Sequence, residues 1–107
     1  MKLDAEQIYD KLVKAGETWA DAEAAADLLE QTKRSVLAKL MNECATPSIG
    51  GKEMIALADP SYIEFVTGMV AARKAANKAK VRYDSAKTLS ELRRSEESTR
   101  RAELTHA

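Results

Sequence analysis

The chain has 107 residues, enough for one domain. Apolar residues make up 45% of it, charged residues 32% and aromatic residues 5%. This composition predicts a helical protein with a thin, alanine-rich core, and it excludes collagen-like, disulfide-rich and membrane-spanning chains. The 17 basic and 17 acidic residues cancel overall, but residues 1–31 carry three basic and eight acidic side chains, and residues 65–107 carry ten and five. The two ends therefore attract each other, and the basic end can also meet an anionic partner.

Apolar residues at helical spacing predict a short first helix within residues 1–16. Gly16 suits the position just after a helix end, and Thr18 followed by Asp21 has the form of a capping box. We therefore expect a second, long helix over residues 18–45 that buries one apolar stripe.

Residues 46–59 are expected to form a linker that contains a short helix over residues 52–58. Pro47 disfavours helical geometry at the residue before it, which ends the preceding helix. Gly50-Gly51-Lys52 lacks the spacing of a phosphate-binding loop and follows no strand, so we interpret it as a turn. Asp59-Pro60 predicts a new helix, because aspartate caps helices and proline fits their first turn.

No further proline follows Pro60 and no further glycine follows Gly68, so residues 60–104 are expected to form one long helix. Beyond Tyr83 the apolar content of this helix falls, and its distal part cannot bury much surface on its own. The sequence therefore predicts an all-α fold in a single domain over residues 1–107. We expect an antiparallel helical hairpin of two long helices, with short N-terminal and connector helices, that self-associates as a homo-oligomer.

Basic residues gather in two groups on the last helix. In the first group Arg73, Lys80 and Lys87 recur every seven residues and share nearly one helical face, with Tyr83 among them. Such a ridge can follow a phosphate backbone, and a tyrosine can stack on a base. The alternative is a solvated helix whose basic segment pairs with the acidic first third of the chain. The candidate nucleic-acid-binding residues of both groups are Arg73, Lys74, Lys78, Lys80, Arg82, Arg93, Arg94, Arg100 and Arg101.

Two motifs lie at the start and at the end of the last helix. Arg94-Ser95-x-x-Ser98-Thr99-Arg100-Arg101-Ala102-Glu103-Leu104 resembles the Arg-Thr-x-x-Ala-Thr-Arg-Arg-Ala-Glu-Met ending of small helical phage and prophage proteins. Asp59-Pro60-x-Tyr62 resembles an upstream motif of the same group. The outline of this group is similar to that of recombination mediators, which load a recombinase onto single-stranded DNA. The resemblance implies a phage accessory protein that binds single-stranded nucleic acid or a recombination protein in the cytoplasm of a bacterial host. An arginine stands at position 93, where an aromatic residue is expected, which weakens a stacking role there.

The residue types needed for catalysis are nearly absent. The chain has one cysteine, Cys44, and one histidine, His106, so a nucleophile pair would require the end of the chain to dock. Glu23 and Asp27 are expected on a solvated helix face rather than around a cation, and Trp19 is expected to anchor the core. We therefore expect a protein that is not an enzyme and has no metal, no cofactor, no small-molecule substrate and no membrane partner.

Two other functions remain open from the sequence. The overall charge balance and the polar distal helix also fit a protein–protein interaction module without nucleic-acid binding, such as a host-defence inhibitor or an assembly factor. A coiled-coil spacer that forms oligomers and binds no ligand is the third possibility.

Overall fold

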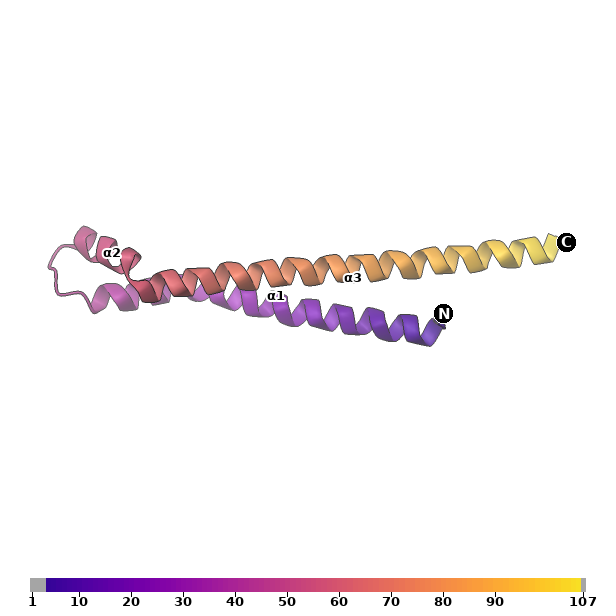
Figure 1. Ribbon diagram of the computed structural model, residues 1–107, viewed down its shortest axis with the longest axis horizontal. Coiled ribbons are helices and arrows are strands. Elements are labelled where there is room, and N and C mark those ends of the chain that lie inside the picture. Colours follow the sequence, from indigo (N-terminus) through magenta and orange to yellow (C-terminus); the bar gives the residue numbers. More distant parts are fainter. Residues whose placement is uncertain (1–3, 107) are drawn as a thin grey trace. The chain divides into compact units, whose positions relative to one another are not determined.

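The computed structural model describes the backbone of residues 4–106, and its helices are labelled in Figure 1. They are α1 (Ala5–Asn42), α2 (Ile49–Ala58) and α3 (Pro60–His106), and no strand occurs among the described residues. The predicted all-α class is therefore confirmed, with two long helices and one short helix.

The expected division between a helix over residues 1–16 and another over residues 18–45 is wrong. One helix, α1, continues through Gly16, and none of the described glycines has a positive φ. A Cβ at Gly16 would lie 3.3 Å from Tyr83 Cε2, so this glycine allows a close approach of α3. A glycine inside a helix costs only about 1 kcal/mol relative to alanine, which does not suffice to end a helix that packs on both sides of that position.

The capping box of α1 lies at its actual start. Asp4 Oδ1 accepts a hydrogen bond from the Gln7 backbone N–H at 2.8 Å, and Gln7 Oε1 accepts one from the Asp4 N–H at 3.1 Å. These reciprocal bonds satisfy two backbone donors that the first turn leaves unpaired. Thr18, which we expected to be a cap, donates its hydroxyl to the Lys14 carbonyl at 2.9 Å inside the helix.

The linker is more helical than the sequence analysis indicated. Ser48 caps α2 by accepting a hydrogen bond from the Gly51 N–H at 2.8 Å, so the helix begins at Ile49 rather than at residue 52. The glycine pair therefore belongs to the first turn of a helix and not to an open turn. Asp59 then ends α2 and caps α3, where its Oδ1 accepts a hydrogen bond from the Ser61 N–H at 2.8 Å.

The chain divides into two compact units. Unit 1 comprises Met1–Asp21 and Asn77–Ala107, and unit 2 comprises Ala22–Ala76. The helices α1 and α3 are each divided between the two units, with one segment in unit 1 and another in unit 2.

Unit 2 has a core made largely of alanine. Ala26 and Ala76 are fully buried, Ala56 is 1% exposed and Tyr62 is 7% exposed. Small side chains let helix backbones approach closely, so this unit is held by close contact rather than by large apolar groups. Along α3 its buried or half-buried residues alternate in steps of three and four, which is the spacing of a helix-packing seam. They include Tyr62, Phe65, Met69, Ala72 and Ala76.

Unit 1 is built on an aromatic pair between antiparallel segments of α1 and α3. The Trp19 and Tyr83 rings stack with their centroids 5.4 Å apart. The same seam spacing continues along this part of α3, but its composition changes from apolar to polar toward the C-terminus. The buried or half-buried positions are Ala79, Tyr83, Ala86, Ser90 and Arg93.

Candidate nucleic-acid interface

Arg73 is held in unit 2 by three carboxylates of α1. Its Nε donates to Glu30 Oε2 at 2.6 Å, its Nη1 to Glu23 Oε1 at 2.8 Å and its Nη2 to Asp27 Oδ1 at 2.6 Å. The hydrogen bonds to Glu30, Asp27 and Glu23, in decreasing order, raise the pKa of Arg73 further above its usual range. The alternative of pairing with the acidic first third of the chain therefore holds for this residue. Its charge is compensated within unit 2. Glu23 and Asp27 lie on a solvated face, with side chains 41% and 51% exposed, and they also pair with this arginine.

One line of basic residues runs along α3 within unit 1. This basic column consists of Lys80, Lys87, Arg94 and Arg101, each seven residues after the one before. Seven residues make nearly two helical turns, so neighbouring members lie about 10.5 Å apart along the helix axis. All four side chains are exposed. One further step toward the N-terminus reaches Arg73, so the same helical position carries the compensated arginine of unit 2.

The basic column receives no carboxylate from α1. Within residues 4–106, Arg73 forms three ion pairs and the four column residues form none. Lys80 Nζ lies 5.9 Å from the centroid of the Trp19 ring, which attracts the ammonium without cancelling its charge. Asp84 and Glu91 follow the first two members of the column by four residues, which is the weaker order on a helix, and Glu97 precedes Arg101 by four residues, which is the stronger order. No ion pair joins any of these residues within the part of the chain that the structure describes. The column therefore presents positive charge to solvent.

The remaining candidate residues do not join this line. Lys74, Lys78 and Arg82 are exposed, but their positions in the seven-residue repeat place them on other faces of α3. Arg93 and Arg100 continue the seam spacing, so they lie beside the basic column on the side of α1. The structure thus divides the nine residues among several faces. It adds Lys87, which lies in the basic segment but was not among the nine.

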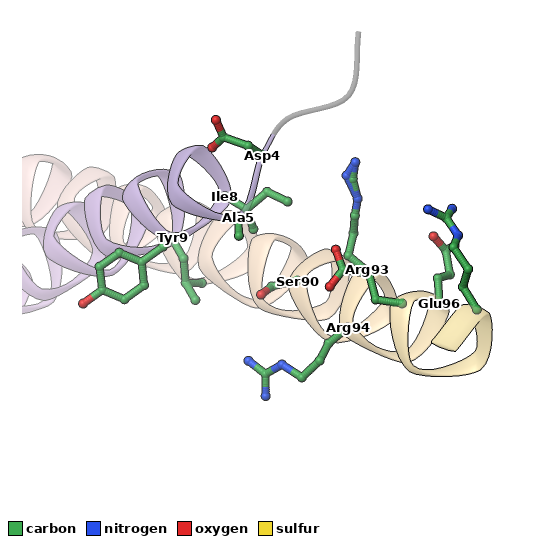
Figure 2. A pocket seen from close by; sticks show the side chains of 11 residues that line it. Asp4, Ala5, Ile8, Tyr9, Ser90, Arg93, Arg94 and Glu96 are labelled. Atoms are coloured by element: carbon green, nitrogen blue, oxygen red, sulfur yellow. The ribbon is translucent and has the colours of Figure 1, made fainter. Parts of the chain in front are cut away.

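A cleft opens where the start of α1 lies against the distal part of α3 in unit 1. It has a volume of about 570 Å³. In Figure 2, Tyr9 and Arg94 project to the same side of the helix pair, and Asp4 and Arg93 project to the other. The lining residues come from α1 (Asp4, Ala5, Ile8, Tyr9, Leu12) and from α3 (Ser90, Arg93, Arg94, Glu96, Glu97, Arg100).

The aromatic residue beside the arginines is Tyr9 rather than Tyr83. Tyr83 is half-buried and stacked on Trp19, so its ring cannot stack on a base as we expected. Tyr9 is 65% exposed and lines the same cleft as Arg94. Sequence reasoning missed Tyr9 because it lies 85 residues from Arg94 in the chain. Only the antiparallel register of the two helices brings them together.

The other singled-out groups show no chemistry of their own. Cys44 is half-buried, and its thiol donates to the Leu40 carbonyl at 3.3 Å. The described residues contain no group of three or more histidine, cysteine, aspartate or glutamate side chains placed to hold a metal ion. The side chain of His106 lies outside the described residues.

Comparisons with protein-family models, with curated proteins and with solved structures find no significant match to this chain. Within residues 4–106, none of the helices has both the length and the apolar content that a membrane crossing requires.

Proposed function

We propose that this protein is a non-enzymatic accessory protein that binds single-stranded nucleic acid through the basic column of α3. The observation that carries the proposal is the contrast between Arg73, which three carboxylates hold, and the four column residues, to which α1 presents none. Lysine and arginine side chains in a line can neutralise successive phosphates without reading a sequence.

The exposed Tyr9 supports a single strand as the ligand. Bases of a single strand are unpaired and can stack on an aromatic side chain, and every base offers a face for this. Tyr9 and Arg94 line the same cleft and project to the same side of the helix pair, so a strand that follows this side would meet both the ring and the guanidinium. In line with the C-terminal resemblance, we propose a phage-type protein that acts with single-stranded nucleic acid or a recombination protein in the bacterial cytoplasm.

We also propose that the antiparallel pairing seen in unit 1 extends to a hairpin of α1 and α3, and that the protein self-associates. Large apolar side chains on α3 remain exposed in the single chain, including Val81 at 63% and Leu92 at 56%. Exposed apolar groups of this kind at helical spacing are typical of helices that pack on another chain.

An interaction with another protein, without nucleic acid, is the second candidate function. The short helix α2 exposes three apolar side chains, Ile49 at 77%, Met54 at 74% and Ile55 at 53%. A stoichiometric protein partner that depends on these residues, with no binding to nucleic acid, would favour the interaction module.

Fluorescence anisotropy with a labelled single-stranded oligonucleotide tests the proposed function. We expect saturable binding at about 50 mM salt that weakens strongly by about 200 mM, because phosphate binding releases counterions. The double variant Lys87→Gln/Arg94→Gln should reduce the slope of log affinity against log salt by about 1.4, at about 0.7 for each lost phosphate contact on a single strand. The matched control Lys74→Gln/Lys78→Gln also removes two charges of α3, from other faces, and should leave the slope unchanged. Absence of binding at the lower salt concentration would refute the proposal.

A further inference from the structure

A stripe without charge runs along the face of α3 that points away from α1 in unit 1. The 11 charged residues between positions 82 and 103 all lie off this stripe. Its members are exposed and recur in alternating steps of four and three. They are Val81, Ser85, Thr88, Leu92, Ser95, Thr99 and Ala102.

The stripe has the features of a helix-packing surface. Steps of three and four residues keep side chains facing a second helix over many turns, and its serine, threonine and alanine side chains permit close approach. The proximal half forms a shallow groove on α3 alone, to which Val81, Leu89 and Leu92 contribute apolar side chains and Asp84 contributes a carboxylate at its edge. Leu89, at 55% exposure, borders the stripe. A phosphate backbone would find no cation on the stripe, so nucleic acid does not account for it.

The charges beside the stripe indicate what covers it. Arg82, Leu89 and Glu96 lie on one edge of the stripe, seven residues apart. When two copies of α3 pack antiparallel about Leu89, Arg82 of each copy faces Glu96 of the other, and the two Leu89 side chains meet at the centre. In antiparallel pairs, equivalent edges face each other, so this arrangement forms two opposite-charge pairs. The other edge of the stripe carries Asp84 and Glu91, and the antiparallel pair brings the two Glu91 side chains near each other, which makes one like-charge contact. A parallel pair would place Glu91 of each copy near Glu96 of the other, which makes two like-charge contacts and no attractive one. The antiparallel pair is therefore the more favourable by charge.

We infer that the occupant of this stripe is a second copy of the chain, packed antiparallel with α3 against α3 and centred on Leu89. The inference rests on the proposed self-association and is independent of nucleic-acid binding. The stripe and the basic column are separated by roughly a third of a turn around α3, since one residue turns a helix by about 100°. The dimer therefore leaves both basic columns exposed.

Charge reversal with rescue tests the arrangement, with sedimentation velocity over a range of protein concentrations as the readout. We expect the unaltered protein to dimerise. Arg82→Glu and Glu96→Arg should each weaken dimerisation about tenfold, because each turns two attractive exposed pairs into repulsive ones. The double variant Arg82→Glu/Glu96→Arg restores the pairing and should recover the original affinity. Circular dichroism of each variant controls for loss of helix.

A disulfide trap provides a second, independent test. In a Cys44→Ser background, Leu89→Cys should form a disulfide-linked dimer on mild oxidation, because the two sulfurs meet at the centre of the interface. Lys87→Cys, on the basic column, is the matched control and should link far less.

The outcomes separate this inference from the proposals on which it builds. A monomer at all concentrations overturns both self-association and the stripe. A dimer that neither single charge reversal weakens, or that the double variant does not restore, overturns the stripe and leaves self-association standing. Equal linking at positions 87 and 89 also counts against the stripe. The anisotropy experiment decides nucleic-acid binding separately.

Discussion

Units 1 and 2 use the same two helices but treat their basic residues differently. In unit 2, α1 presents Glu23, Asp27 and Glu30 to Arg73, and each guanidinium nitrogen donates to one of these carboxylates. In unit 1, α1 carries Glu6, Asp10, Glu17 and Asp21, but within the described residues no ion pair joins any of them to a residue of the basic column. A basic residue at one and the same position of the seven-residue repeat is therefore structural in one unit and available for binding in the other. What the neighbouring helix presents decides between the two roles.

The two units also differ in how they are held together. Unit 2 packs alanines that are fully buried, such as Ala26 and Ala76, whereas unit 1 depends on the stack of Trp19 and Tyr83. Tight packing of small residues tolerates little added volume, and an aromatic stack tolerates little loss of area. Removing side-chain volume should therefore destabilise unit 1 most, and adding side-chain volume should destabilise unit 2 most.

The largest effect is expected from Trp19→Ala. Truncating a packed tryptophan should lower the free energy of unfolding by about 3 kcal/mol, with hydrogen-exchange protection lost first in unit 1. Urea denaturation measures the loss. Trp19→Phe is the matched control, because it keeps an aromatic ring and removes an indole N–H that is buried without a hydrogen-bond partner within the described residues. If both variants lost equal stability, the stack would not be what holds unit 1.

Ala26→Leu is the corresponding test in unit 2. This position is fully buried, so three extra carbons should force the helices apart and cost about 1–3 kcal/mol in the free energy of unfolding. Ala24→Leu places the same side chain on an exposed position of the same helix and should change stability little. Thermal unfolding of the pair gives the comparison. A tolerated Ala26→Leu would contradict the close packing of the alanine core.

The two glycines inside the long helices sharpen the comparison at a smaller scale. Gly68 has nothing within 4 Å of an added Cβ, so Gly68→Ala should stabilise the protein by about 0.5–1 kcal/mol through helix propensity alone. Gly16→Ala should gain less or nothing, because its Cβ would lie 3.3 Å from the Tyr83 ring. Equal gains in urea denaturation would show that Tyr83 does not require a glycine at position 16.

The sequence predicted those features that depend on local chemistry. The helix start at Asp59-Pro60 follows from capping, and the uninterrupted α3 follows from the absence of glycine and proline after Gly68. Local signals misled at Gly16, because the cost of one glycine is small beside the packing of a long helix. The cap at Ser48 is also a local feature, but the glycine pair after it predicted a turn instead of the first turn of α2.

The candidate site was only partly predictable, because its members gain their roles from the register of two helices. The basic residues were evident from composition, and three of them from their spacing of seven. That Arg73 is compensated and Arg94 is not depends on which residues of α1 lie opposite, and no pattern within α3 contains this information. Placing Tyr9 beside Arg94 depends on the same register.

The central claim is that the charge of the basic column is available to nucleic acid and the charge of Arg73 is not. The most direct test compares Arg94→Gln with Arg73→Gln by anisotropy of a labelled single strand, titrated with salt. We expect Arg94→Gln to reduce the slope of log affinity against log salt by about 0.7, and Arg73→Gln to leave this slope unchanged while lowering the melting temperature. A slope that falls equally in both variants, or only in Arg73→Gln, would contradict the account.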